Sequence, residues 1–262
     1  MTLPTVLPPG TILQLMHVRD RLTRITPGVF VAIGPGTGDI TALLLELGWR
    51  GTAFDLSTET IESLQIRFSD GIRTGKLVVA KADFCTLVLK PKSVNLVISS
   101  MVIEHLDDAN EAHSFEKARA CLTAGGVSIH FDPAHMRYWG SEDDIAGHVR
   151  RYSYASTHDL AVRLGWQIKQ MSRLTILLSN LLLPLSNRQV KQHEVDKLAL
   201  TYLDRSKDTG QQNVTNKIHF PLYLRYFLNH YILFPFYILQ KMFAQASRAM
   251  LFYVELKPIH PS

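Results

Sequence analysis

The chain has 262 residues, of which 46% are hydrophobic and 19% charged, a composition that favours a globular protein with a sizeable buried core. Its formal net charge of +5 at pH 7 suits anionic substrates or a membrane surface, but no block of lysine and arginine marks a nucleic-acid face. The two cysteines, Cys85 and Cys121, show neither metal-ligand spacing nor a disulfide framework, and Cys121 is expected to be a buried free thiol.

The first 28 residues begin with prolines and then place Ile12, Leu15, Met16 and Leu22 at helical spacing. This pattern predicts an N-terminal helical cap over residues 1–28 that covers the core. Whether this cap also helps to close a ligand site is left open. No basic region followed by an apolar stretch marks a signal peptide, and the longest uncharged runs are too short to span a bilayer. We therefore expect a cytoplasmic protein.

Residues 29–33 form a short apolar run that is typical of a buried parallel strand. Three glycines follow at alternate positions, Gly34, Gly36 and Gly38, and a helical pattern begins after them. A strand, a glycine turn and a helix together let backbone N–H groups approach a nucleotide-like ligand. The third glycine comes one residue earlier than in dinucleotide-binding turns, and Asp39 follows it, where its charge would repel a pyrophosphate. The turn therefore favours a ligand without phosphate groups.

The stretch Ile33-Gly-Pro-Gly-Thr-Gly38 resembles the first motif of class I S-adenosylmethionine (SAM) dependent methyltransferases. The resemblance implies an α/β fold with a Rossmann-like, doubly wound sheet of seven strands, the last of them antiparallel. It also implies SAM as the cofactor, with five residues of the turn under its amino acid end: Gly34, Pro35, Gly36, Thr37 and Gly38. The family usually has an acidic residue two positions before the first glycine. This chain has Ala32 there, so the resemblance does not extend to one indirect contact with the methionine amino group.

Two further acids stand at the ends of predicted strands. Asp55 ends the second strand and lies 19 residues after the second glycine of the turn, where Rossmann-type folds place a carboxylate on ribose hydroxyls. Its two oxygens match two neighbouring hydroxyls, and Leu56 is assigned to the same cofactor site. Asp83 and Phe84 follow the third strand. The resemblance implies that Asp83 accepts a hydrogen bond from the adenine amino group, and that Phe84 offers its backbone N–H and lines the adenine slot.

A fourth strand is predicted over residues 93–99, and its carboxyl end should lie at the ligand edge of an open parallel sheet. This position assigns three more residues to the cofactor site: Ser99, Ser100 and Met101. Glu104 is assigned to the substrate, and His105 either acts as a base or only orients the loop. The pattern Glu-x-x-Glu-His at this place resembles a metal-binding variant seen in some methyltransferases. Here Met101 replaces the first Glu, which leaves too few hard ligands for Mg²⁺, so we expect no metal site.

A fifth strand is predicted over residues 127–131, after a turn at Gly125 and Gly126. Residues 134–155 then form a polar and aromatic connection that is long enough to be functional in a compact domain. We interpret it as a substrate lid in which Trp139, Arg150 and Arg151 contact the acceptor, with an arginine on an anionic group. The candidates for proton transfer near this edge are His105, Asp132, His135, His148 and Tyr152. An open alternative is that residues 148–152 only tie the loop to the acidic residues 142–144.

A helix is predicted to open at Ser156 in capping-box style, before a sixth strand over residues 166–171. The best candidate for a seventh strand is residues 250–256. We therefore expect a core of residues 29–172 plus 249–257, and a mostly helical insertion over residues 173–248. Four roles stay open for the insertion: a substrate cap, a dimer interface, a surface resting on a membrane, and plain packing. Its aromatic density favours an apolar acceptor.

Together the motifs predict a SAM-dependent methyltransferase that moves a methyl group by in-line displacement to a small, hydrophobic acceptor, such as a lipid-like molecule or a secondary metabolite. Nucleic acid is not expected as a partner, and peripheral membrane contact and a homodimer are left open. Two other classes compete. Ala32 and Met101 lend some support to a non-catalytic binding module. A nicotinamide-dependent oxidoreductase is disfavoured by the glycine spacing and by Asp83 with Phe84.

Overall fold

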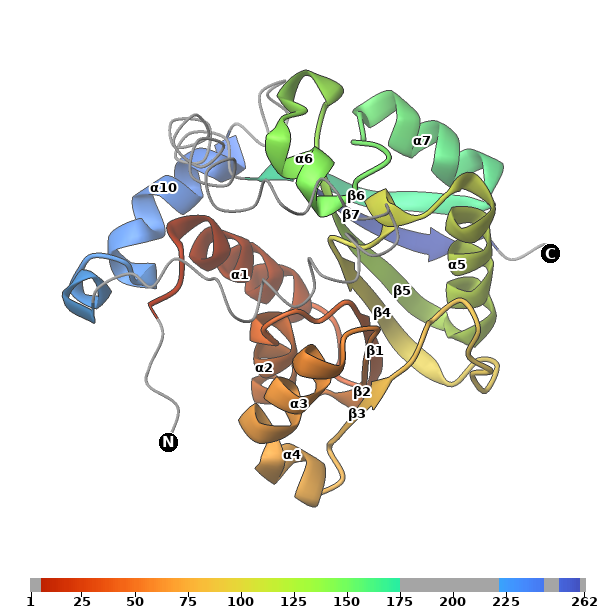
Figure 1. Cartoon of the computed structure of the whole chain (residues 1–262), viewed down its shortest axis with the longest axis horizontal. Helices are drawn as coiled ribbons and strands as arrows, with labels where there is room; N and C mark the ends of the chain where they lie inside the picture. The colour runs from red at the N-terminus through yellow and green to blue at the C-terminus, as the bar shows by residue number, and fades with distance from the viewer. Residues whose placement is uncertain (1–5, 175–221, 243–249, 260–262) are drawn as a thin grey trace.

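The computed structural model describes residues 6–174, 222–242 and 250–259. In this part of the chain, seven strands form one sheet in the order β3-β2-β1-β4-β5-β7-β6 (Figure 1). Strand β7 runs antiparallel to both of its neighbours, and the other pairs are parallel. The predicted Rossmann-like sheet with an antiparallel last strand is confirmed. The strands are β1 (Val29–Ile33), β2 (Arg50–Asp55), β3 (Leu77–Lys81), β4 (Val94–Ser100), β5 (Leu122–Pro133), β6 (Trp166–Leu174) and β7 (Leu251–Pro258).

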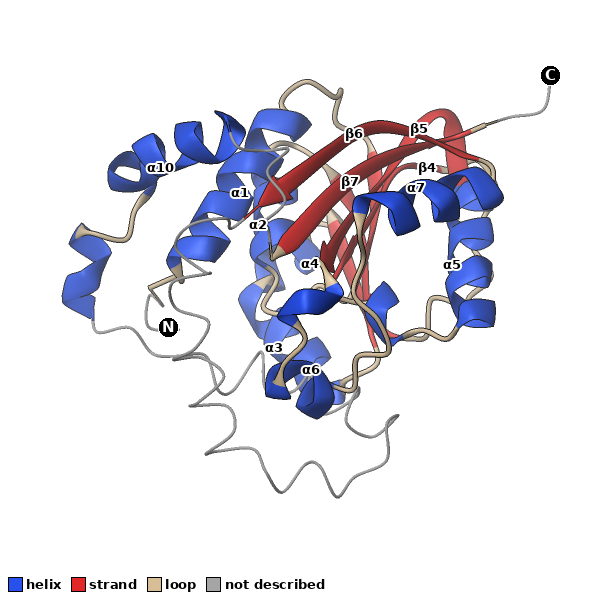
Figure 2. Ribbon diagram, turned by 90° about the horizontal axis from the view of Figure 1, so that it is seen from above, coloured by secondary structure: helices blue, strands red, loops and turns tan. Residues whose placement is uncertain are grey.

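Helices cover both faces of this sheet (Figure 2). They are α1 (Pro9–Leu22), α2 (Asp39–Glu46), α3 (Thr58–Arg67), α4 (Ser69–Arg73), α5 (Asp108–Cys121), α6 (Ser141–Ala146), α7 (Tyr154–Arg163) and α10 (His230–Met242). Short 3₁₀ turns lie at η1 (Ile103–His105), η2 (Met136–Tyr138) and η4 (Leu222–Tyr226). None of the helices in the described ranges is long and apolar enough to cross a membrane.

The sequence of strand β1 is apolar throughout because both faces of the strand are buried. Phe30 and Ala32 join a buried cluster with residues of α1, α2 and α3, while Val31 and Ile33 join a second cluster with residues of α5 and α7. Successive side chains of a strand point to opposite faces, so a strand covered on both faces has no polar position. The unbroken run of residues 29–33 therefore reflects a central strand between two helical layers.

Three helices begin after a residue whose side chain accepts a hydrogen bond from the backbone N–H of the third helical residue. Ser57 is the N-cap of α3 and accepts a hydrogen bond from the backbone N–H of Thr60, and Asp107 caps α5 in the same way. The predicted start at Ser156 was wrong, because Ser153 is the N-cap of α7. Ser156 is instead the third helical residue, and its hydroxyl accepts from the Ser153 N–H at 2.8 Å. It is the second half of a capping box rather than its beginning.

Other boundaries also differ from the prediction. Strand β5 begins at Leu122, so Gly125 and Gly126 lie within the strand, at an irregularity in its pairing with β4, and not in a turn before it. Residues 134–155 hold η2 and α6 as well as loop. Strand β6 extends to Leu174, beyond the predicted end. Glycine lowers strand propensity, which explains why the sequence pattern placed the start of β5 too late.

The predicted insertion lies mostly outside the described residues, and of its first apolar stretch only Leu174 is described, as the end of β6. The second stretch contains η4 and α10. Helix α10 packs on α1, where Leu233 and Tyr237 form a small apolar cluster with Ile12 and Leu13. These contacts place the N-terminal helix between α10 and the sheet.

Strands β1 and β2 approach very closely at Gly51. A Cβ atom there would lie 2.0 Å from the backbone oxygen of Phe30. We predict that Gly51→Ala lowers the free energy of unfolding by about 1–3 kcal/mol or more, because backbone atoms must move to admit the methyl group. Gly125→Ala is the control, since a Cβ there meets nothing within 4 Å, and it should change stability by less than about 0.5 kcal/mol. Urea denaturation measures both values, and equal effects would contradict this account.

His17 lies on α1 against Tyr253 of β7, with ring centroids 4.7 Å apart, and is 4% exposed. Burial, followed by the charge of Arg21, lowers the pKa of His17 to about 4. Between about pH 6.5 and pH 4 the unfolded chain therefore binds a proton that the folded chain does not. The free energy of unfolding should fall as the pH falls through this window.

Replacing His17 with Phe should reduce that slope by at most about 1.4 kcal/mol per pH unit, the value for one proton. Other buried histidines remain, so the slope should be reduced rather than abolished. Urea denaturation at several pH values between 4.5 and 6.5 measures the slope. A variant with the slope of the unaltered protein would overturn the assignment of a neutral, buried His17.

Candidate active site

The glycine turn after β1 needs glycine for two separate reasons. Gly34, Gly36 and Gly38 all have positive φ angles, of 60°, 53° and 80°, which side chains rarely allow. At Gly34 a Cβ atom would also lie 2.3 Å from the side chain of Val102. The turn is therefore packed directly against the segment that follows β4. It continues into α2, for which Gly38 is the N-cap residue.

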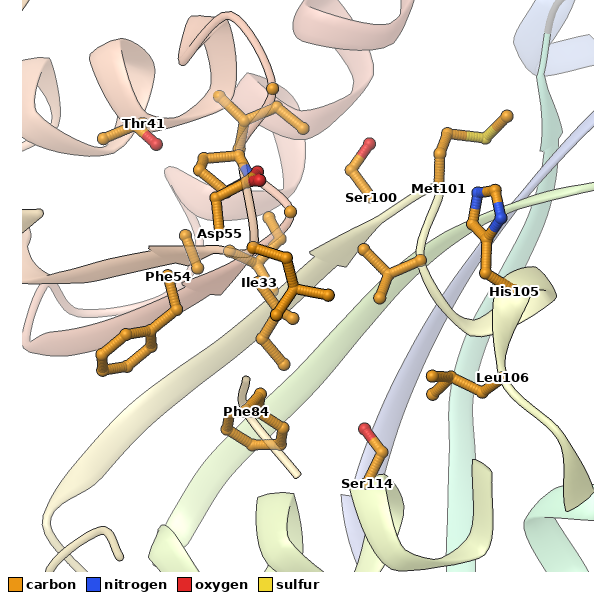
Figure 3. Close-up of a pocket in the computed structure, with 18 of the residues that line it drawn as sticks. Ile33, Thr41, Phe54, Asp55, Phe84, Ser100, Met101, His105, Leu106 and Ser114 are labelled. Carbon is orange, nitrogen blue, oxygen red and sulfur yellow. The ribbon is translucent and has the colours of Figure 1, made fainter. Parts of the chain in front are cut away.

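A cavity of about 480 Å³ opens at this turn, along the carboxyl ends of β1, β2 and β4 (Figure 3). This volume is in the range of small-molecule sites. Most of the predicted cofactor residues line it: Gly34, Pro35, Gly36, Thr37, Asp55, Leu56, Asp83, Phe84, Ser100 and Met101. Two predicted residues, Gly38 and Ser99, are not among the lining residues. A Cβ on Gly38 would meet Leu64 and Phe68, and Ser99 is 1% exposed within β4.

The acids of the cavity differ in their partners. Asp55 accepts a hydrogen bond from the Ser57 N–H at 2.9 Å, and burial raises the pKa of Asp55. A raised pKa means that the carboxylate loses more hydration than its hydrogen bonds replace. Two ligand hydroxyls would restore those bonds, so the site fits a vicinal diol. Asp83 is exposed and accepts from the Cys85 N–H at 2.8 Å, and the buried Phe84 stands beside it.

Asp39 also lines the cavity, at the place where a dinucleotide-binding turn has no charge. Its carboxylate accepts from the hydroxyl of Thr37 at 2.7 Å and from Arg67 at 2.9 Å. The acid is held within the turn, so a pyrophosphate would meet it directly. This geometry favours a ligand without phosphates.

Sequence reasoning missed the contribution of helices to this cavity. Thr11, Gln14 and Leu15 of α1, together with Asn110 and Ser114 of α5, line its walls. No motif marks them, because they come from helices that reach the cavity only after packing. The helical spacing within residues 1–28 was the one available signal, and α1 does close part of the site.

Met101 stands at the end of β4 with a φ angle of 56°, which is uncommon for a residue with a side chain. Its N–H donates to the backbone oxygen of Phe131 at 2.8 Å, and its side chain is 40% exposed on the cavity wall. Backbone strain of this kind collects at functional sites. Figure 3 shows Met101 beside His105, at one end of the cavity.

His105 is the one proton-transfer candidate among the lining residues in the described part of the chain. Burial, followed by the charge of His148, lowers the pKa of His105 to about 4, so its imidazole is neutral at pH 7. The rings of His105 and His148 meet edge to face, with centroids 4.8 Å apart. Glu104, beside them, is completely buried, and burial raises its pKa to about 7.

The segment of residues 134–155 is organised by Asp143. Its carboxylate accepts from Arg151 at 2.7 and 3.0 Å, from Nδ1 of His148 at 2.8 Å, and from the Gly140 N–H at 2.8 Å. Asp143 is 0% exposed, and Arg151 lies almost wholly inside the protein. This favours the alternative in which residues 148–152 tie the loop to the acidic triplet. The assignments of Arg151 to the substrate and of His148 to proton transfer remain predictions.

The remaining assigned residues lie outside the cavity lining. Arg150 pairs with Asp108 at 2.8 Å and Glu111 at 3.3 Å, and Tyr152 donates its buried hydroxyl to Glu111 at 2.6 Å. The indole N–H of Trp139 donates to Asp144 at 2.8 Å.

Two candidates lie on the strand side. Asp132 is 3% exposed, and burial, followed by the charges of Glu104 and Glu111, raises its pKa. His135 packs on Phe252, and burial lowers the pKa of His135. Their catalytic roles remain predictions.

A family model described as "Methyltransferase domain" matches residues 30–126, the part that carries the glycine turn, Asp55 and Asp83. Residues 30–126 are therefore similar in sequence to a methyltransferase domain. The predicted resemblance to class I SAM-dependent methyltransferases is confirmed. An uncharacterised methyltransferase, YrrT of Bacillus subtilis, is 29% identical over 114 residues, which are 44% of this chain and 48% of the relative. The chain thus spans about half the length of the curated relatives it matches.

Solved structures share the fold of this chain. A phosphoethanolamine N-methyltransferase 2 of Haemonchus contortus, in complex with SAM, has a TM-score of 0.58 at 17% identity, over 94% of this chain and 52% of that protein. The PH0226 protein of Pyrococcus horikoshii has a TM-score of 0.51 at 16% identity, over 62% of this chain and 84% of that one. At these identities the likeness concerns the fold alone.

We predict that Arg151→Met destabilises the protein by about 3–5 kcal/mol, because it leaves the buried carboxylate of Asp143 without its bidentate partner. Arg73→Met is the matched control. It removes an ion pair with Asp70 whose two side chains are 74% and 90% exposed, and it should cost less than about 1 kcal/mol. Chemical denaturation measures both. An Arg151 variant as stable as the control would contradict a structural role.

Proposed function

We propose that the protein is an enzyme that transfers a methyl group from SAM to a small, hydrophobic acceptor. The observation that carries this proposal is the cavity in which the glycine turn, Asp55 and Asp83 come together at the carboxyl ends of parallel strands. The partly desolvated Asp55 suits the two ribose hydroxyls, and Asp83 with Phe84 suits an adenine ring. The turn, with Asp39 held inside it, suits the amino acid end of a ligand without phosphates.

When bound, SAM supplies an electrophilic methyl carbon on its sulfonium. The residues of this chain then have to hold the acceptor in line with that carbon and exclude water. Met101, Val102 and Leu106 give the wall near His105 an apolar character. His105, a neutral imidazole, adds a polar group to that wall. These features support a hydrophobic acceptor with one polar reacting group.

Exposed apolar side chains on α10, among them Tyr231, Phe234 and Phe236, are compatible with peripheral membrane contact or a homodimer. Membrane contact, dimerisation and a cytoplasmic location remain predictions. A nicotinamide-dependent oxidoreductase is not supported, because Asp39 would face the pyrophosphate of the nucleotide. Nothing in the geometry specifically favours a non-catalytic module.

The proposal predicts that the protein binds SAM and S-adenosylhomocysteine in calorimetric titration, and that NADH does not bind. Asp55→Ala should weaken SAM binding about 10- to 100-fold, the equivalent of a lost hydrogen bond to a charged group. Asp70→Ala is the control, since this exposed acid lies on α4 and pairs only locally. Absence of SAM binding to the unaltered protein, or equal affinities in both variants, would overturn the proposal.

A further inference from the structure

Glu104, His105 and His148 bring three possible metal ligands together beside the cavity. One ligand atom of each residue lies within 4.8 Å of the others. Glu104 and His105 come from η1, directly after β4, whereas His148 comes from the segment after α6. The cluster therefore joins two parts of the chain, and only His105 of the three lines the cavity.

Glu104 gives an independent reason to expect a ligand here. Its side chain is completely buried, and neither carboxylate oxygen has a hydrogen-bond partner among the described residues. Nε2 of His148 lies 3.8 Å from Oε1, which is too far for a hydrogen bond. A buried carboxylate without hydrogen bonds is costly, so such groups are normally paired or bind a metal ion.

Both histidines are oriented as metal ligands usually are. Nδ1 of His105 lies 3.3 Å from the backbone oxygen of Gly147, and Nδ1 of His148 lies 2.8 Å from Oδ1 of Asp143. Because each Nδ1 faces an oxygen acceptor, it carries the proton and leaves the lone pair on Nε2. A histidine that donates its other N–H to a carboxylate or a backbone oxygen is the usual arrangement around a bound metal.

Asp143 is itself held rigidly, by two hydrogen bonds from Arg151 and one from the Gly140 N–H. The carboxylate that orients His148 is therefore held in a fixed position. Nitrogen and oxygen ligands of one zinc ion lie about 3.3–3.6 Å apart, given metal–ligand distances near 2.1 Å. The His148–Glu104 pair is at 3.8 Å and all three ligand atoms lie within 4.8 Å of one another, so side-chain rotations that move these atoms by about 1 Å would close the set.

We propose that Glu104, His105 and His148 bind a divalent transition-metal ion, and that zinc fits this donor set best. Two imidazoles and one carboxylate are ligands that zinc accepts, whereas Mg²⁺ prefers oxygen. The replacement of an acid by Met101 argues against Mg²⁺ but not against zinc, and the contribution of His148 was not visible in the sequence. Three protein ligands leave one zinc position for another group. The site goes beyond the proposed function and does not depend on it.

The test is a calorimetric titration of chelator-treated, full-length protein with ZnCl₂, in the absence of SAM. We expect one zinc ion per chain. Glu104→Gln and His105→Gln should each weaken binding at least about 100-fold, more than the loss of a group that only orients a ligand. His158→Gln is the control, because His158 is exposed and lies on α7 outside the cluster, and it should bind as the unaltered protein does.

A second measurement does not depend on any variant. Co²⁺ added to the chelator-treated protein should give the visible absorption of a four-coordinate site, and one equivalent of Zn²⁺ should remove it. Circular dichroism establishes that each variant is folded, and Glu104→Gln should fold because it removes an unpaired buried charge. Absence of stoichiometric zinc binding, or equal binding by all variants, would overturn the proposal and leave a His148–Glu104 contact without metal. SAM titration of the same samples reports the methyltransferase proposal separately.

Discussion

The sheet reverses its chain order between β1 and β4, and the rest of the molecule depends on that junction. On one side of the junction β1 is followed by β2 and β3, and on the other side β4 is followed by β5. The loops that leave β1 and β4 therefore turn away from each other and leave a crevice between them. In this protein Gly34 of one loop lies directly against the side chain of Val102 in the other. Asp55 ends β2, which pairs with β1, and Asp83 follows β3, which pairs with β2.

Buried charge organises the other half of the site. Glu104, Glu111, Asp132 and Asp143 are all nearly inaccessible to solvent. Arg151 neutralises Asp143, and Arg150 pairs with Glu111, while Glu104 and Asp132 have no comparable partner among the described residues. The polar residues of the loop that follows β5 therefore act first as a framework. His105 contacts His148 and Gly147 of this loop, and it also lines the cavity.

The sequence predicted well the features that depend on short segments. Asp55 and Asp83 were found because a residue at the end of a parallel strand has its position fixed by the strand itself. The seven strands were found for the same reason, although their ends were misplaced where glycine or a capping box obscured them. Partners such as Arg151 with Asp143 were different, because several acids were equally near in sequence and only the path of the loop chose among them. The helix residues Thr11 and Gln14 carry no signal of their own before α1 packs on the sheet.

The position of β7 has a consequence for the synthesis of the protein. Strand β7 lies between β5 and β6, and β6 is the edge strand that pairs with β7 alone in the described sheet. During translation β5 and β6 leave the ribosome long before residues 251–258, so each waits with an unpaired backbone edge. Exposed strand edges favour aggregation. The nascent chain is therefore most vulnerable while residues 175–250 are being made, and truncation before β7 would leave that vulnerability permanent.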